Sequence, residues 1–340
     1  MGKYLLRRLL IIPFMLLGIS LIAFVLSHTV PADPVNAALG EGAIGKPELV
    51  RAYKEKWGLD KSLPEQYIVY VSHLVQGDFG TSIVSARSVG ADLGEALPAT
   101  FELATVAILL SLLGVPLGIL AAVKHKRLLD TLIRLFSLLG SSVPVFWLAY
   151  LAIFLFYTQL SWLPATDRLD TGVAAPTHIT GFYTLDSLLT AHLDTFGMSL
   201  KHLLLPALVL SLTIVGTIIR ITRTITLDVL QQEYIRTATS KGLTRATVLR
   251  RHALPNILVP VVTVISLSYG NLLSGTVLTE TIFGYPGLGR YAFQSATHLD
   301  FPAIMGVSIV VALIYIIINL AVDMLYSLLD PRIRTRVSPT

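Results

Sequence analysis

Residues that could do chemistry are few in this sequence, and none of them forms a catalytic pattern. The 340 residues include no Cys, which excludes disulfides, thiol catalysis and Cys-metal sites. The eight His residues are scattered, and no HExxH, GxSxG or CxxC pattern occurs. Gly40, Gly45 and Lys46 fit most of a phosphate-binding GxxxxGK loop, but Pro47 stands where Ser or Thr should hold Mg²⁺. We therefore expect no catalytic residue, no metal site and no bound cofactor on this chain.

The most informative polar stretch is 233–255, EYIRTATSKGLTRATVLRRHALP, which lies between two long apolar runs. Leu227, Leu230, Tyr234 and Ala238 recur at helical spacing, which predicts one helix through them. Lys241 and Gly242 have the composition of a helix end, and Thr244 can cap a second short helix that we expect to stop at Pro255. The segment carries the single acid Glu233 against Arg236, Lys241, Arg245, Arg250 and Arg251.

The composition indicates that a membrane surrounds these polar stretches. Hydrophobic residues make up 54% of the chain and charged residues 14%, with a mean hydropathy of +0.71. Soluble domains carry about a quarter charged residues, so this chain has too little polar surface to face water throughout. The net charge of +5 lies in short basic groups between apolar runs, which is the pattern of membrane orientation and not of nucleic-acid binding.

Six apolar runs predict six transmembrane helices, with both termini in the cytoplasm. Seventeen of the 26 Lys and Arg residues fall in the segments that this topology places inside. The first run exceeds the length of a signal-peptide core, so we expect it to be retained as a helix. The runs are Leu9–Ser27, Leu103–Val123, Leu135–Tyr157, His202–Ile219, Asn256–Thr279 and Phe301–Val322.

Few ionisable residues interrupt these runs; Glu102 and Asp323 lie at their edges. Ion-coupled carriers usually place such groups at mid-membrane, so their scarcity disfavours a secondary carrier that works alone.

The segment 29–98 predicts a small helical region outside the membrane. Leu49, Tyr53 and Trp57 form one helical stripe, and Gly58 ends it. Ser62 and Glu65 fit a capping box for a second helix that ends at Gly77. The expected organisation is residues 1–28 as a tail and first helix, 29–98 as this region, 99–328 as the transmembrane core with a coupling loop at 225–255, and 329–340 as a cytoplasmic tail.

The outer segment 280–290 contains several turn-forming residues, and we expect no regular helix to pass through it. It could be a plain outer hairpin, or a loop at the pore mouth that serves as an outer gate or as a docking site for a binding protein. The candidate residues for these roles are Glu280, Phe283, Gly284, Tyr285, Pro286, Gly287, Gly289 and Arg290.

The segment 233–255 resembles the EAA loop of ABC-transporter permeases, through Ala238, Gly242 and the pair Leu254-Pro255. Arg236-Thr237 stands where the general family has Glu-Ala, and YIRTAxxKGL is the form of the dipeptide, oligopeptide and nickel branch. Residues 280–290, ETIFxxPGLGR, resemble the same branch. Further landmarks are Pro31-Ala32-Asp33-Pro34, with Ala32 where the family usually has Gly, Gly58-Leu59-Asp60-Lys61, Gln66-Tyr67, Gly77-Asp78-Phe79-Gly80 and the tail Asp330-Pro331-Arg332.

The resemblance implies an all-α membrane protein with the type I ABC importer permease fold and a helical extracytoplasmic insertion between helices 1 and 2. It implies a non-catalytic permease of the bacterial inner membrane that forms a pore for di- or oligopeptides. Nickel, glutathione and other small solutes remain alternatives, and a channel working alone is disfavoured.

The implied partners are a second related permease, two ATP-binding subunits that carry ATP and Mg, an extracytoplasmic solute-binding protein, and membrane lipid. The residues implied in contact with the ATP-binding subunits are Glu233, Tyr234, Arg236, Thr237, Ala238, Lys241, Gly242, Leu243, Leu254 and Pro255.

Overall fold

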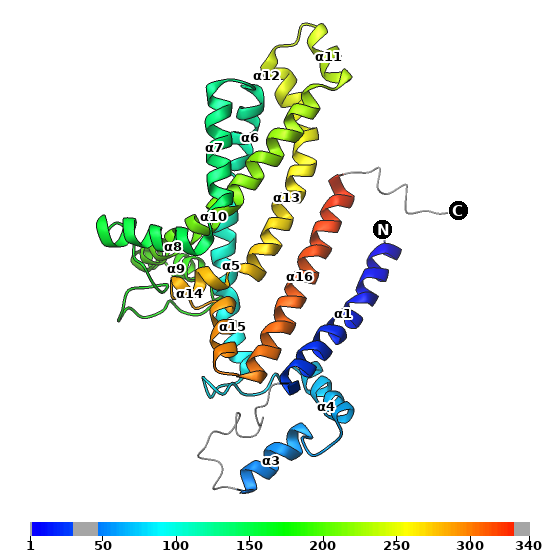
Figure 1. The fold of residues 1–340 in the computed structure, drawn as a ribbon, viewed down its shortest axis with the longest axis vertical. Coiled ribbons are helices and arrows are strands. Elements are labelled where there is room, and N and C mark those ends of the chain that lie inside the picture. The colour runs from blue at the N-terminus through cyan, green and yellow to red at the C-terminus, as the bar shows by residue number, and fades with distance from the viewer. Residues whose placement is uncertain (1, 30–46, 330–340) are drawn as a thin grey trace. The chain divides into compact units, whose positions relative to one another are not determined.

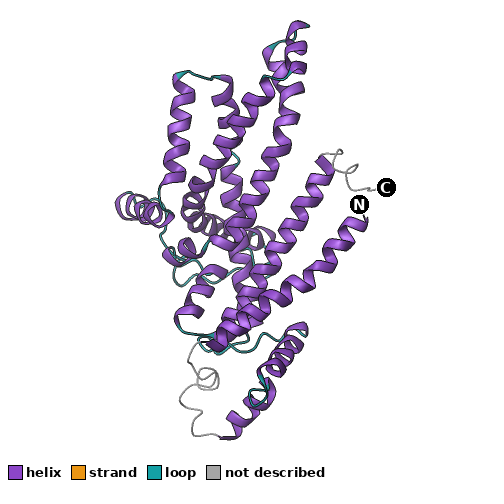
Figure 2. Ribbon diagram, turned by 45° about the vertical axis from the view of Figure 1, so that its right-hand side comes forward, coloured by secondary structure: helices purple, strands orange, loops and turns teal. Residues whose placement is uncertain are grey.

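The computed structural model describes residues 2–29 and 47–329, and every regular element in these ranges is a helix (Figure 2). The Pro31 landmark, the GxxxxGK stretch at Gly40–Lys46 and the tail from Asp330 lie outside the described residues. The chain divides into two compact units, which we describe separately. Helices α5 (Val89–Ser111) and α16 (Phe301–Leu329) contribute residues to both.

The described helices confirm the predicted membrane protein. Five are long and apolar enough to cross a bilayer, at Leu10–Thr29, Val89–Val123, Leu193–Leu230, Arg245–Leu273 and Phe301–Val322. A sixth crossing results if the bent pair Leu128–Ser142 and Val145–Gln159 counts as one span. Lipid offers backbone N–H and C=O groups no hydrogen-bond partners. A helix pairs these groups with one another, so helices of this length can cross the acyl chains.

Unit 1 comprises residues 1–100 and 286–316. It holds α1 (Gly2–Thr29), α3 (Pro47–Trp57), α4 (Leu63–Val75), the start of α5, α15 (Leu288–Thr297) and most of α16. An apolar cluster of Phe24, Tyr70 and Ile309 joins α1, α4 and α16.

The helix ends of this unit confirm the sequence predictions. Glu65 accepts a hydrogen bond from the Ser62 backbone N–H at 3.0 Å, as a capping box requires. Gly58 and Gly77 follow α3 and α4 in the left-handed conformation.

Unit 2 comprises residues 101–285 and 317–340. Its described elements, besides the ends of α5 and α16, are α6 (Gly114–Val123), α7 (Leu128–Ser142), α8 (Val145–Ala152), the π-helix η2 (Ile153–Gln159), α9 (Tyr183–Leu189), α10 (Leu193–Leu230), α11 (Glu233–Ser240), α12 (Arg245–Thr247), the π-helix η3 (Val248–Ala253), α13 (Leu254–Gly275) and α14 (Val277–Ile282). Helix α10 packs against α6, α7 and α13 (Figure 1).

Glycines let these helices approach closely. A Cβ on Gly118 of α6 would lie 2.7 Å from the Ile219 carbonyl oxygen, and one on Gly140 of α7 would lie 2.6 Å from that of Leu212. Both carbonyls belong to α10, so the backbones of three helices meet where side chains are missing. Small residues at such contacts are the usual means of tight helix packing in membranes.

The third apolar run is not one straight helix. The chain bends by 101° between α7 and α8. Val143 is extended, with φ −85° and ψ 129°, because the following Pro144 disfavours the helical conformation in the residue before it. The helix therefore restarts in a new direction at Val145, and Figure 1 shows α8 leaving α7 sideways.

Candidate functional site

The segment 233–255 folds as a helical hairpin that follows α10 after a short break. The expected single helix through Leu227 and Ala238 is wrong, because α10 ends at Leu230 and α11 starts at Glu233. Gln232 is extended, with φ −67° and ψ 148°, which breaks the helix, and Glu233 then places an acidic side chain in the first turn of α11. A negative charge at that position is favourable because the unpaired N–H groups of a helix start carry partial positive charge.

The turn of this hairpin confirms two predictions. Gly242 follows α11 with φ +79°, a conformation that L-residues with side chains rarely adopt. Thr244 caps α12, because its hydroxyl accepts a hydrogen bond from the Thr247 N–H at 3.3 Å. The prediction that Pro255 ends this second helix is wrong, since the chain continues through η3 into α13. The wider π-helical turn precedes Pro255, which has no N–H to donate and sits in the first turn of α13.

The hairpin has one buried apolar face and one exposed polar face. Ile235, Ala238 and Val248 are buried together with Ala253 and Ile257 at the start of α13, and Ile225 of α10 packs against them. The sequence-predicted coupling residues mostly lie on the other side of α11. Exposed among them are Glu233, Tyr234, Arg236, Thr237, Lys241, Gly242, Leu243 and Pro255, whereas Leu254 is half-buried and Ala238 is buried. The hairpin is thus anchored to two long helices and presents a basic outer surface.

The predicted outer segment 280–290 is more helical than expected. Glu280 belongs to α14, where its carboxylate accepts a hydrogen bond from the buried Thr276 hydroxyl at 2.7 Å. A tight turn follows, with Gly284 at φ +58°, and α15 begins at Leu288 and includes Gly289 and Arg290. The expectation of no regular helix therefore holds for the turn alone. The two Gly and one Pro that interrupt the helix all lie within 284–287, so helices form on either side of the turn.

Tyr285 and Phe283 are fully buried, each 1% exposed. The Phe283 carbonyl accepts a hydrogen bond from the Asp167 N–H at 3.1 Å, which joins this turn to the segment after η2. Burial raises the pKa of the Tyr285 phenol far above its usual value, so its hydroxyl stays protonated and can donate. Both aromatic candidates for an outer gate are therefore buried inside unit 2.

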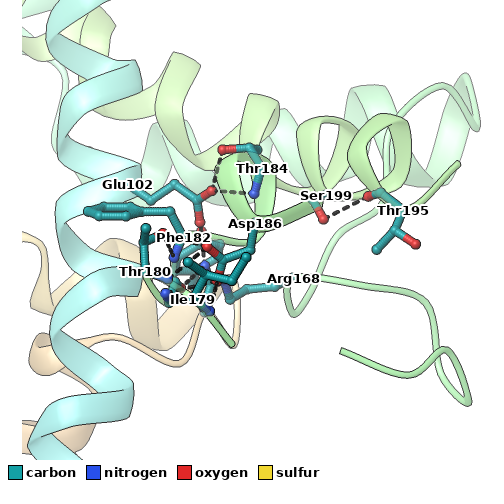
Figure 3. Close-up of polar contacts among 11 residues, drawn as sticks. Glu102, Arg168, Ile179, Thr180, Phe182, Thr184, Asp186, Thr195 and Ser199 are labelled. Carbon is teal, nitrogen blue, oxygen red and sulfur yellow. Dashed lines mark hydrogen bonds and ion pairs between the residues drawn. The ribbon is translucent and has the colours of Figure 1, made fainter. Parts of the chain in front are cut away.

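A buried ion pair organises the part of unit 2 that contains Tyr285 (Figure 3). Arg168 and Glu102 form the pair, and each is less than a tenth exposed. Glu102 also accepts hydrogen bonds from the Thr184 N–H at 2.8 Å and from the Tyr285 hydroxyl at 3.3 Å. Arg168 stacks on the Tyr183 ring at 3.5 Å and donates to the Gly181 carbonyl at 3.0 Å. These contacts tie α5, the 160–182 segment, α9 and the turn after α14 together. We call them the ion-pair cluster.

A second carboxylate, Asp186, holds the backbone next to this cluster. It accepts hydrogen bonds from the N–H groups of Ile179, Thr180 and Gly181 at 3.2, 2.8 and 2.9 Å (Figure 3). Burial by itself would raise the pKa of Asp186, but the hydrogen bonds from Thr180 and its neighbours outweigh it and hold the pKa below its usual value. The group is therefore ionised at neutral pH and keeps the turn at 179–181 closed.

The remaining residues of the predicted outer segment line a cavity of about 230 Å³ in unit 1. Pro286, Gly287 and Arg290 form one side of it, and Ser85 and Asp92 form part of the other. Asp92 accepts a hydrogen bond from the Tyr291 hydroxyl at 3.2 Å. Within the described ranges, no group of three or more His, Asp or Glu side chains has a geometry that could hold a metal ion.

Comparison with known proteins decides what kind of membrane protein this is. Residues 114–335 match the family model described as the binding-protein-dependent transport system inner membrane component, and residues 1–104 match the model of its N-terminal membrane component. The chain belongs to this permease family. The two matches cover almost the whole sequence and confirm both the resemblance and the type I permease fold.

Individual relatives of this permease are similar over nearly their full length. The probable D,D-dipeptide transport system permease protein DdpB of Escherichia coli strain K12 is 45% identical over 317 residues, which cover 93% of each chain. The dipeptide transport system permease protein DppB of Alkalihalophilus pseudofirmus is 39% identical over 335 residues, 98% of this chain and 100% of the relative. The di/tripeptide transport system permease protein DppB of Pseudomonas aeruginosa is 39% identical over 336 residues, 98% and 99% of the two chains.

The sequence analysis did not predict the ion-pair cluster of this permease. The apolar pattern places Glu102 at the edge of a run, whereas α5 begins thirteen residues earlier, at Val89, and Glu102 is buried. One signal could have pointed to it. Arg168 is the single Lys or Arg in an outer segment that also holds Asp167, Asp170, Asp186 and Asp194. Sequence alone could not show that its partner lies 66 positions away.

Proposed function

We propose that this permease forms half of the pore of an ATP-driven importer for di- or oligopeptides. The observation that carries the proposal is the hairpin 233–255. It is anchored by a buried apolar face to α10 and α13, and its exposed basic face offers a docking platform. The relatives named as dipeptide and di/tripeptide permeases support peptides as the cargo.

The proposed assembly pairs this chain with a second related permease, and places two ATP-binding subunits at the hairpin. ATP and Mg would be held by those subunits alone. A solute-binding protein would deliver the peptide at the opposite side of the membrane. This orientation puts the hairpin and both termini in the cytoplasm, because the short segments rich in Lys and Arg stay on that side.

In the proposed cycle, closure of the ATP-binding subunits moves α11 as a rigid body. The buried contacts of Ile235 and Ala238 pass that movement to the ends of α10 and α13. The close backbone contacts of α10 with α6 and α7 make these helices move with it. Tilting them opens the pore to the outside, and ATP hydrolysis returns them.

Affinity purification tests this assembly. The tagged chain is extracted from native membranes in mild detergent, and the proteins that elute with it are identified by mass spectrometry. We expect two ATP-binding subunits with Walker motifs and a second chain with six predicted spans. A solute-binding protein that co-elutes can be screened against di- and tripeptides, nickel and glutathione. A chain that elutes alone after gentle crosslinking would contradict the proposal.

A further inference from the structure

Helices α8 and η2 form an apolar arm that turns away from α7 and has little protein around it. The lateral arm, as we call residues 145–159, leaves α7 at 101° (Figure 1). It packs against α10 and α14 along α8, where Ala149 is fully buried. No residue of η2 is buried. Most of the arm therefore has no protein cover within unit 2.

The composition of the lateral arm excludes water as its surroundings. No Asp, Glu, Lys, Arg or His occurs between Val145 and Trp162. Aromatic residues make up 9% of the chain, yet seven of them fall between Phe146 and Trp162. A helix that is hydrophobic on all sides must be buried in protein or in lipid. Trp and Tyr, four of these seven, are the residues enriched where acyl chains meet headgroups.

Helix α7 carries an exposed apolar row that leads directly into the lateral arm. Leu128, Leu132, Leu135 and Leu139 are exposed along α7, which is uncharged from Leu135 onwards. In a membrane protein such an apolar row is covered by acyl chains or by another helix, and not by water. The arm continues this row directly after Val143 and Pro144, with Phe146 and Tyr150 exposed. Its uncovered surface is therefore continuous with the exposed apolar row of α7.

The length of α7 sets the depth of the lateral arm. The helix starts next to the basic turn Lys124–Arg127, which must lie among headgroups or in water. Its fifteen residues rise about 22 Å, at about 1.5 Å each. The hydrocarbon core is about 30 Å thick, so α7 ends inside it and does not reach the opposite headgroups.

We propose that the lateral arm lies in the plane of the membrane, embedded in the leaflet opposite the basic turn, with lipid acyl chains covering its exposed side. Its aromatic residues meet the acyl chains and the base of the headgroups at one level. Because α8 packs against α10 and α14, the arm also holds these two helices at a set depth. The third crossing is then made by α7 alone. Because α7 is shorter than the hydrocarbon core is thick, the bilayer thins around it or the side chains that flank it snorkel to the headgroups.

Depth measurements on spin-labelled variants test the in-plane arm. The chain has no Cys, so single-cysteine variants need no background substitutions. Phe146→Cys, Tyr150→Cys, Phe154→Cys and Tyr157→Cys are labelled with a nitroxide in the full chain, assembled with its subunits in phosphatidylcholine–phosphatidylglycerol liposomes. Collision with oxygen, which concentrates in the bilayer, is compared with collision with a water-soluble nickel chelate. We expect all four labels to be reached by oxygen at depths that agree within about 5 Å, half the diameter of a helix.

Leu132→Cys and Leu139→Cys on α7 calibrate this experiment. Their depths should differ by about 10 Å, because seven residues rise by about 1.5 Å each along a crossing helix. A steady depth change of about 16 Å from position 146 to 157 would mean that the arm spans the membrane and would overturn the proposal. Labels that neither reagent reaches would overturn it too, because a partner chain would then cover the arm.

Tryptophan fluorescence provides a second measurement that does not depend on labelling. The chain holds three Trp residues, and Trp147 and Trp162 lie in or next to the arm. Trp57→Phe combined with either Trp162→Phe or Trp147→Phe leaves one reporter. Lipids brominated at successive acyl positions then quench it according to depth. The same bromine position should quench both reporters most strongly, and maxima at opposite ends of the acyl chain would contradict an in-plane arm.

Discussion

At the scale of single residues, Glu102 and Arg168 depend on each other because neither can reach water. Both are almost fully buried, and Arg168 Nε has no hydrogen-bond partner in the structure. Removal of one member of a buried ion pair leaves the other charge uncompensated, which destabilises proteins by about 3–5 kcal/mol. We expect Glu102→Gln to lower the thermal unfolding temperature of the purified permease clearly, measured by the loss of monodisperse protein on heating.

Two further variants separate the charge from the shape of this site. Glu95→Gln breaks an exposed pair with Arg87, and such surface pairs contribute about 0–1 kcal/mol, so it should leave the unfolding temperature almost unchanged. Glu102→Gln combined with Arg168→Met removes both charges and should recover part of the lost stability. If Glu102→Gln unfolds at the same temperature as the parent, the Glu102–Arg168 pair does not hold the ion-pair cluster together.

Gly242 tests the hairpin at a single backbone position. A Cβ there would meet nothing within 4 Å, so a substitution acts through the φ of +79° and not through crowding. That conformation disfavours side chains by about 1–2 kcal/mol, and a β-branched residue resists it most. We expect Gly242→Val to insert normally but to hydrolyse ATP without uptake, measured in proteoliposomes with the partner subunits.

Gly77 provides a matched control for this variant. It has the same φ of +79° and also has no neighbour within 4 Å, but it ends α4 in unit 1. Gly77→Val should therefore carry the same backbone strain and still couple ATP hydrolysis to uptake. Gly242→Asn should keep most activity, because Asn tolerates left-handed backbone. Normal uptake by Gly242→Val would sink the assignment of the hairpin as the coupling element.

At the scale of elements, the fit of α10 against α7 depends on Gly216. The Ser137 hydroxyl donates a hydrogen bond to the Gly216 carbonyl at 2.6 Å, and a Cβ on Gly216 would fall far inside contact distance of the Ser137 carbonyl oxygen. Backbone cannot move aside as a flexible side chain can. We expect Gly216→Ala to separate the two helices and destabilise the permease by about 1–3 kcal/mol, seen as a lower unfolding temperature.

The same helix contains the control for this change. Gly197 lies in α10 with no atom within 4 Å of its Cβ position. Gly197→Ala should raise the unfolding temperature slightly or leave it unchanged, because Ala stabilises a helix interior by about 0.5–1 kcal/mol relative to Gly. Equal effects of the two substitutions would show that helix propensity, and not close packing, decides the result at Gly216.

Long elements with strong local patterns could be predicted from the sequence, and long-range contacts could not. The apolar runs predict spanning helices because lipid leaves the chain no alternative, and the cap residues at Ser62 and Thr244 act within one helical turn. Pro144 lies within the third apolar run, but whether a proline bends, breaks or redirects a helix depends on its neighbours. The pairing of Glu102 with Arg168 depends on how α5 and the outer segment pack, which no local pattern contains.

At the scale of the whole permease, one helix links the hairpin 233–255 to the ion-pair cluster. Helix α10 has 38 residues and so extends about 57 Å, at about 1.5 Å per residue. Its start packs with α9, which carries Asp186 and Thr184, and the hairpin follows its end. A movement of the hairpin therefore reaches the cluster through one continuous element, without a chain of small side-chain shifts.

In the proposed assembly, docking at the hairpin is separate from the stability of the fold, and charge reversal tests that separation. Arg236 of α11 and Lys241 just after its end are exposed, whereas Ile235 on the other side of α11 is buried. We expect Arg236→Glu combined with Lys241→Glu to insert and unfold like the parent but to retain at least about tenfold less ATP-binding subunit in a pull-down, a loss of about 1.4 kcal/mol in binding. Ile235→Asp should instead destabilise the chain itself, because it buries an unpaired charge among apolar side chains.

Arg51→Glu combined with Lys54→Glu is the matched control for the charge change. Arg51 is exposed and Lys54 partly exposed on α3, so the net charge changes equally on a surface far from the hairpin in sequence. This control should retain the ATP-binding subunits at the parent level, because in the proposed orientation α3 lies on the other side of the membrane. If both double variants lose the subunits equally, net charge accounts for the loss. If neither does, the basic face of the hairpin is not where these subunits bind.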